Sequence, residues 1–132
     1  MARPKTAGPT ERELEILGVL WELGPSSVRD IFEMLDRKRK TAYNSVLTIL
    51  LTMLEKGYVG RDESQKSHIY RASYSKTQIE ETLVKTFMDG MFGGSAMRLV
   101  TRALSVKGAS REESEKIRAL LEEMEREDDA AD

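Results

Sequence analysis

The sequence contains no cysteine, one histidine and three prolines, and these scarcities exclude several kinds of protein. Without cysteine there is no disulfide framework of the kind that stabilises small secreted domains, and the chain fits a reducing compartment. A zinc site would have to combine His68 with carboxylates alone, which is a poor ligand set for zinc. We therefore expect no metal site and no cofactor.

Long apolar runs are also missing, because no stretch approaches the ~18 residues that a membrane-spanning helix needs. The first nine residues lack the apolar segment of a secretory signal, so we expect a cytoplasmic protein. No nucleophile motif, P-loop or dinucleotide fingerprint occurs. Paired acids such as Glu80 and Glu81 lie in a predicted first helical turn, where the helix dipole favours them. We do not expect an enzyme.

Charge is divided unevenly along the chain, whose net charge is -2. Residues 1–74 hold 12 Lys and Arg against 10 Asp and Glu, or +2, whereas residues 75–132 hold 9 against 13, or -4. Four consecutive cations at 37–40 supply much of the positive charge of the first part. Contact with phosphate requires such a local patch and not a basic protein, so the overall charge does not exclude DNA binding.

The segment after this basic cluster predicts a helix that ends at Lys56 and Gly57. At about 100° per residue, small polar side chains share one arc of this helix and apolar side chains lie opposite. A solvated helix face is the alternative, but such faces usually carry Glu, Lys, Gln and Arg, because Thr, Ser and Asn cost helix stability. We therefore predict a face that contacts base edges in a DNA groove. The polar arc consists of Thr41, Asn44, Ser45, Thr48 and Thr52, and the apolar side consists of Val46, Ile49, Leu50 and Met53.

Two helices and a hairpin surround this predicted recognition helix. A capping box at 10–13 begins a helix over about 11–23, and a similar signal at 27–30 begins a short second helix. Two extended runs, 58–63 and 67–72, flank a polar turn and predict a hairpin. Three helices followed by a hairpin is the order of a winged helix-turn-helix. We predict a mainly α fold with a small β-hairpin wing, in which residues 1–74 form the DNA-binding domain.

Residues 75–132 are predicted to be wholly helical, with a break at 92–95 and fraying from Arg126. Helices this short bury little by themselves, so we predict a helical dimerisation domain. In the alternative, these helices fold back on the N-terminal part as one monomeric core; the capped helix start after the wing and the apolar cluster at 87–92 favour the dimer. The predicted interface consists of Phe87, Met88, Met91, Phe92, Leu99, Val100, Leu104, Ile117, Leu120 and Leu121.

From about Thr10 to Glu123 the chain resembles the penicillinase-repressor family (BlaI/MecI type) of bacterial winged-helix repressors. Each landmark is weak alone, but their order and spacing together are specific. The landmarks are 13–17 with Leu20 and Trp21, Gly24 with Pro25, 27–29, 42–48, 55–59, 61–63, Tyr70 with Arg71, 92–95, and Leu99 with Val100.

The resemblance implies a homodimeric repressor on a palindromic operator that dimerises through its C-terminal helices. It also implies release through a membrane sensor with a metalloprotease domain, which triggers cleavage of the repressor within the dimerisation region. The family's cut site is often an Asn-Phe pair, and here the corresponding place is near Arg102 and Ala103, so the chain departs from the pattern.

The sequence thus predicts a transcriptional repressor whose partners are a double-stranded DNA operator, a second copy of itself and a sensor metalloprotease pathway. Asn44 is expected to pair with adenine, and Thr48 to contact a base or a thymine methyl group. Tyr43 is equally compatible with a phosphate contact and with packing against the core. The rival prediction is a winged-helix scaffold that binds protein and not DNA. The predicted DNA-binding residues are Arg37, Lys38, Arg39, Lys40, Thr41, Tyr43, Asn44, Ser45, Thr48, Thr52, Arg61, Lys66, His68 and Arg71.

Overall fold

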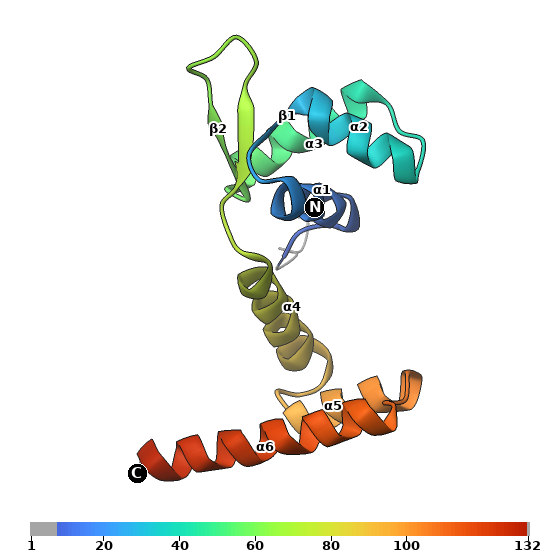
Figure 1. The fold of residues 1–132 in the computed structure, drawn as a ribbon, viewed down its shortest axis with the longest axis vertical. Helices are drawn as coiled ribbons and strands as arrows, with labels where there is room; N and C mark the ends of the chain where they lie inside the picture. The colour runs from blue at the N-terminus through green and yellow to red at the C-terminus, as the bar shows by residue number, and fades with distance from the viewer. Residues whose placement is uncertain (1–7, 132) are drawn as a thin grey trace. The chain divides into compact units, whose positions relative to one another are not determined.

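The computed structural model describes residues 8–131 and contains six helices and three short strands within them (Figure 1). The chain divides into two compact units, one ending at Phe87 and the other beginning at Met88. The boundary falls inside a helix, α4 (Lys76–Met91). None of the described helices is both long enough and apolar enough to span a membrane.

The first unit begins with three helices: α1 (Glu11–Leu23), α2 (Val28–Lys38) and α3 (Tyr43–Lys56). The predicted capping box starts α1, since the Glu13 backbone N–H donates to the Thr10 hydroxyl and the Thr10 backbone N–H donates to the Glu13 carboxylate. Gly57 ends α3 with a φ of 85°, in the left-handed region that favours glycine. The predicted bounds of the first helix and the end of the third are confirmed.

The predicted hairpin is present as β2 (Val59–Asp62) and β3 (Ile69–Ala72), which pair antiparallel. A two-residue strand, β1 (Ser26–Ser27), pairs with the other edge of β3 and makes the sheet order β1-β3-β2. The sequence did not predict β1. Its pairing fixes the start of α2 to the base of the wing, and Ser27 also caps α2 by accepting the Asp30 N–H.

The core of the first unit is made from the inward faces of all these elements. Because α1, α2 and α3 each present apolar residues three or four positions apart, their buried stripes meet around Leu17, Ile31 and Leu50. The predicted fold class, mainly α with a hairpin wing, is confirmed. The buried core residues are Ile16, Leu17, Val19, Leu20, Ile31, Leu35, Val46, Leu50, Met53, Val59, Tyr70 and Ile79.

Ile79 belongs to α4, so the first turns of that helix pack with the winged-helix core. Ser75 and Gln78 cap the start of α4 reciprocally, as predicted. The compact unit therefore extends beyond residue 74. Division of function between residues 1–74 and 75–132 stays a prediction.

The second unit contains the end of α4, α5 (Ala96–Val106) and α6 (Arg111–Ala131). The predicted break between α4 and α5 is present at Gly93 and Gly94, whose φ values are 60° and 76°. The predicted fraying from Arg126 is wrong, because α6 continues to Ala131. No residue of α5 or α6 is buried. The second unit, taken as one chain, thus has little core of its own.

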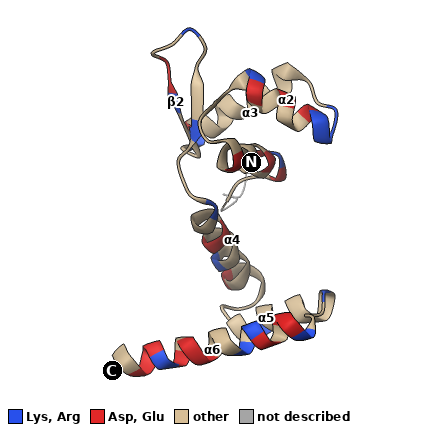
Figure 2. Ribbon diagram, viewed as in Figure 1, with Lys and Arg blue, Asp and Glu red and all other residues tan. Residues whose placement is uncertain are grey.

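All four cations of the basic cluster at 37–40 precede α3, as predicted, and the structure divides them between α2 and the connection to α3. Arg37 and Lys38 form the last turn of α2, and Arg39 is its C-cap (Figure 2). The helix dipole favours cations at this end, which accounts for the extension of α2 into the cluster. Lys40, Thr41 and Ala42 connect α2 to α3.

Candidate nucleic-acid interface

The polar strip of α3 consists of Asn44, Ser45, Thr48 and Thr52, and all four residues are exposed. The opposite face holds Val46, Leu50 and Met53 in the core, so the helix cannot turn to hide the strip. Thr41, which the sequence assigned to the same arc, is half-buried and lies before α3, where its backbone N–H donates to Asp36. The predicted separation of polar and apolar sides is present within α3.

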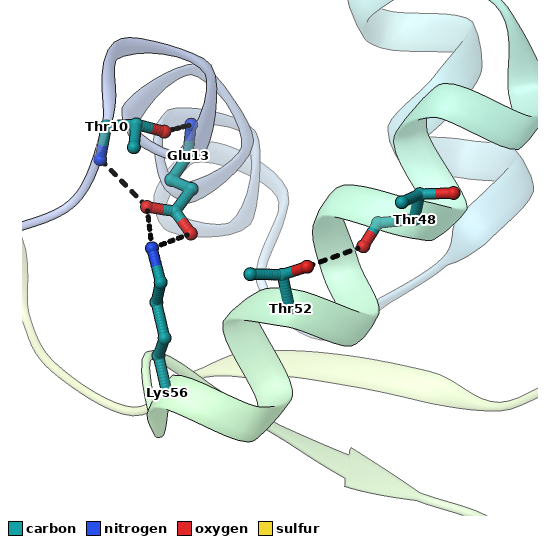
Figure 3. Close-up of polar contacts among 5 residues, drawn as sticks. All are labelled: Thr10, Glu13, Thr48, Thr52 and Lys56. Atoms are coloured by element: carbon teal, nitrogen blue, oxygen red, sulfur yellow. Dashed lines mark hydrogen bonds and ion pairs between the residues drawn. The ribbon is translucent and has the colours of Figure 1, made fainter. Parts of the chain in front are cut away.

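Threonine hydroxyls of the polar strip are already engaged with the helix itself. Thr48 Oγ1 donates to the backbone carbonyl of Asn44 at 2.9 Å. Thr52 Oγ1 donates to the backbone carbonyl of Thr48 at 3.1 Å (Figure 3). Each hydroxyl oxygen can still accept a hydrogen bond, and each methyl group stays free. The side chains of Asn44 and Ser45 have no hydrogen-bond partner within residues 8–131. They are therefore the members of the strip whose full donor and acceptor capacity is available.

An ion pair ties the C-terminal end of α3 to the start of α1. Lys56 Nζ lies 3.2 and 3.1 Å from the two carboxylate oxygens of Glu13, which also accepts the Thr10 backbone N–H (Figure 3). Burial raises the pKa of Glu13, but the hydrogen bond from Thr10 and the nearby Lys56 ammonium outweigh it, so the net pKa is lowered. Glu13 is thus held as a carboxylate, and α3 is fixed at the end opposite the predicted contacts.

Tyr43, the first residue of α3, packs within the fold. Its ring meets that of Phe32 edge-on with centroids 5.6 Å apart, and the Arg29 guanidinium lies 5.7 Å from its centroid. The side chain is nevertheless 37% exposed. The structure thus shows the packing role that the sequence left open, while a phosphate contact by the Tyr43 hydroxyl stays a prediction.

Arg61 in β2 is held inside the wing. Its Nη1 donates to the buried Tyr70 hydroxyl at 3.3 Å, and its Nη2 pairs with Glu63. These contacts raise the pKa of Arg61, chiefly through the bond to Tyr70. Arg71, in contrast, is exposed on β3 opposite Gly60, and its guanidinium occupies the space that a Cβ at Gly60 would fill. Arg61 is therefore partly engaged within the fold, whereas Arg71 lies on the surface.

A groove of about 490 Å³ separates α3 from the wing. Lys66 and His68 lie on its wing side, and Tyr43, Leu47 and Leu51 lie on its α3 side. The structure thus brings together four residues that the sequence placed in the DNA site without a common location. They are Tyr43, Arg61, Lys66 and His68.

The basic cluster is exposed, but its members differ in what they contact. Arg39 Nη2 pairs with Glu15 Oε1 of α1 at 3.1 Å. Arg37, Lys38 and Lys40 have no ion-pair partner among the residues that the structure describes. Three of the four cations are thus free to meet phosphate.

Three surface residues near this site were missed by the sequence analysis. Arg12 of α1 shares a shallow hollow with the polar strip, Arg29 lies over Tyr43, and Leu51 is 45% exposed in the groove. The hollow beside Arg12 is formed with residues of α3, which the sequence of α1 does not indicate. Arg29 and Leu51 depend on contacts between separate elements, which the sequence does not show.

The residues predicted to form a dimer interface are mostly exposed in the single chain. Phe87, Met91, Val100, Leu104, Leu120 and Leu121 are exposed, and Met88, Phe92, Leu99 and Ile117 are half-buried. Further exposed apolar residues on the same helices were not predicted: Val84, Met97, Val106 and Met124. Across residues 8–131 no group of His, Asp and Glu side chains is arranged to hold a metal ion.

Two named relatives cover most of this chain. The methicillin resistance regulatory protein MecI of Mammaliicoccus sciuri is 22% identical over 117 residues, which are 89% of this chain and 95% of that protein. The penicillinase repressor of Staphylococcus aureus is 19% identical over 112 residues, or 85% of this chain and 89% of that protein.

Two solved structures are similar in part. The solution structure of the DNA-binding domain of the repressor BlaI has a TM-score of 0.49 at 17% identity and covers 57% of this chain and 92% of that one. A MarR family protein from Bacillus stearothermophilus has a TM-score of 0.49 at 20% identity and covers 90% of this chain and 74% of that one.

The sequence model of the penicillinase repressor family matches residues 9–123, which confirms the resemblance that the landmarks indicated. The chain therefore belongs to the penicillinase repressor family, a family of transcriptional repressors and not of enzymes.

Proposed function

We propose that this protein is a homodimeric transcriptional repressor that binds a palindromic DNA operator through α3 and the wing. The observation that carries the proposal is the polar strip, which follows the basic cluster at 37–40. Its residues Asn44 and Ser45 are exposed, and their side chains have no hydrogen-bond partner within residues 8–131. Membership of a repressor family and the names of its relatives support the same conclusion. A helix with this distribution enters the major groove with its N-terminal residues at the base edges.

Within the major groove of DNA, Asn44 is the residue suited to bidentate pairing with adenine N6 and N7. The Thr48 hydroxyl already donates its hydrogen bond to the Asn44 carbonyl. Toward DNA, Thr48 therefore acts as a hydrogen-bond acceptor or through its methyl group. Of the base contacts expected from the sequence for Thr48, those in which it accepts a hydrogen bond or packs against a thymine methyl group are left. Ser45 keeps both donor and acceptor functions.

The groove between α3 and the wing fits one sugar–phosphate strand of the duplex. Lys66 and His68 on the wing and the Tyr43 hydroxyl on α3 are polar groups placed to meet backbone oxygens. These contacts would fix the position of α3 along the duplex but would not distinguish one DNA sequence from another. The cations at 37–40 would add further phosphate contacts beside the start of α3.

We assign dimerisation to the helices of the second unit. No residue of α5 or α6 is buried in a single chain, although apolar residues such as Val100, Leu104 and Leu121 recur on their surfaces. A second copy would cover these faces, and a two-fold axis would present two α3 helices to two half-sites. An operator with two-fold symmetry follows from this arrangement.

Repression would end when the dimer is divided. Arg102 and Ala103, the place that corresponds to the family's cut site, are exposed within α5. A protease of the sensor pathway would need α5 to unwind locally, because a peptide must be extended to be cut. Loss of α5 would then remove part of the proposed dimer surface and weaken operator binding.

Asn44→Ala tests the base-contacting role of α3. We expect it to cost ~1–3 kcal/mol of affinity on the preferred operator and little on random duplex, because the lost contact is to a base. Titrations by fluorescence anisotropy on both duplexes measure the two losses. Thr82→Ala, an exposed polar change on α4, is the control. Equal losses of Asn44→Ala on both duplexes would reject the base contact, and a wild-type protein without duplex preference would favour the protein-binding scaffold.

A further inference from the structure

A cation from outside the helix-turn-helix lies beside the polar strip. Arg12 of α1 lines a shallow hollow of about 450 Å³ together with Asn44, Ser45 and Thr48 of α3. The groove that meets the wing lies along the other side of α3, where Tyr43, Leu47 and Leu51 are found. The polar strip is therefore flanked by cationic side chains on two sides: Lys66 on one, Arg12 on the other.

Nothing in the fold accounts for an arginine at this position. Arg12 is the second residue of α1, where the positive end of the helix dipole disfavours a cation, and the flanking Glu11 and Glu13 follow the usual preference. Its side chain is exposed and has no hydrogen-bond or ion-pair partner among residues 8–131. The guanidinium is therefore available to a ligand, and its place beside the polar strip distinguishes it from other first-turn cations such as Lys76.

The acids that neighbour Arg12 in the sequence of α1 do not pair with it. Glu13 is turned inward and pairs with Lys56, while Glu15 pairs with Arg39. Glu11 is the next residue along α1, so its side chain leaves the helix about 100° away from that of Arg12. The guanidinium of Arg12 is thus a free cation on the surface that carries the polar strip.

We propose that Arg12 is a DNA phosphate contact on the side of α3 opposite the wing, an assignment that rests on the proposed function. The major groove is bordered by two phosphate strands, so cations on the two sides of a helix that enters it can each meet one strand. The wing groove supplies the anchor for one strand, and Arg12 supplies that for the other. Guanidinium donors match phosphate oxygens and carry no base preference by themselves.

The test is Arg12→Gln, with Lys76→Gln as the matched control. Lys76 is also an exposed cation in a first helical turn of the same unit, but it lines a different hollow with Trp21 and Glu80. Affinities are measured for the enriched operator and for random duplex over a range of salt. Arg12→Gln should weaken both on the order of fivefold to tenfold near ~0.1 M salt and reduce the salt slope by about 1.8, because each dimer carries two copies of Arg12. Lys76→Gln should leave both affinities and the slope unchanged.

A methylphosphonate scan of the operator locates the contact. Neutralising one particular phosphate per half-site should lower the operator affinity of the wild type and leave that of Arg12→Gln unchanged. Arg12→Gln should melt at or slightly above the temperature of the wild type, because Arg12 has no partner to lose among the described residues and the helix dipole disfavours its charge.

Unchanged affinity and slope in Arg12→Gln, with a wild type that prefers its operator, would overturn this assignment alone. A loss confined to the operator would also overturn it, because Arg12 would then contact a base. A wild type without duplex preference would overturn the proposed function together with it.

Discussion

Replacing Glu13 by glutamine removes the charge that ties the start of α1 to the end of α3. Glutamine keeps an acceptor for the Thr10 backbone N–H but leaves Lys56 without its carboxylate. Breaking a fully buried pair costs roughly 3–5 kcal/mol, and breaking an exposed one roughly 0–1 kcal/mol. The Glu13 side chain is 3% exposed and the Lys56 side chain 40%, so the ammonium can regain water. We therefore expect a loss of about 1–2 kcal/mol in the free energy of unfolding.

Urea denaturation at pH 7, followed by circular dichroism, measures this loss. A double-mutant cycle with Lys56→Met separates the pair from the other effects of each change. We expect a coupling energy of about 1 kcal/mol, since both partners lose the same interaction. Glu11→Gln, an exposed acid in the same turn, is the control and should change little.

The dependence on pH follows from the lowered pKa of Glu13. A carboxyl whose pKa is lower in the folded state contributes its full stability above its unfolded pKa, near 4.5, and loses it as pH falls through the folded value. The difference between wild type and Glu13→Gln should thus be constant from about pH 5.5 to 8 and shrink below about pH 4.5. Additive single mutants, or a difference that does not shrink as pH falls below about 4.5, would refute the reasoning.

Two further predictions concern the end of α3 and the second unit. Gly57→Ala should destabilise the protein by roughly 1–2 kcal/mol in urea denaturation, because Gly57 has a φ of 85°. Gly90→Ala inside α4, where no atom lies near the Cβ position, should be neutral or stabilising. Equal effects of the two substitutions would contradict the backbone argument. Leu99→Asp should give monomers in light scattering and weak operator affinity, whereas Leu23→Asp, at an exposed apolar site of α1, should stay dimeric. A dimeric Leu99→Asp protein would reject this placement of the interface.

The sequence predicted the features that depend on neighbouring residues. The capping box at Thr10 and Glu13 and the glycine at 57 act within one turn of the chain, so their effects follow from local chemistry. The wing followed from two extended runs around a polar turn. The opposite faces of α3 followed from helical periodicity alone, and the structure buries Val46, Leu50 and Met53 as that periodicity requires.

The features that the sequence did not predict depend on contacts between distant parts. The strand β1 has two residues and exists through its pairing with β3, about 43 residues further along the chain. The hollow that joins Arg12 to Asn44, and the pairing of Arg39 with Glu15, likewise connect separate helices. The hydrogen bond from the Thr48 hydroxyl to the Asn44 carbonyl is local. The same hydroxyl could instead bond to water or to a base, and helical periodicity does not indicate which partner it takes.

Selection of the purified wild-type protein on a pool of random DNA duplexes, at low and at moderate salt, tests the central claim most directly. Our account predicts enrichment of a site with two-fold symmetry, whose half-sites are separated by a whole number of helical turns, about 10 base pairs each. Affinity for this site should fall with salt, because phosphate contacts supply much of the binding. Absence of enrichment at both salt concentrations would contradict a DNA-binding repressor and favour a winged-helix scaffold that binds protein.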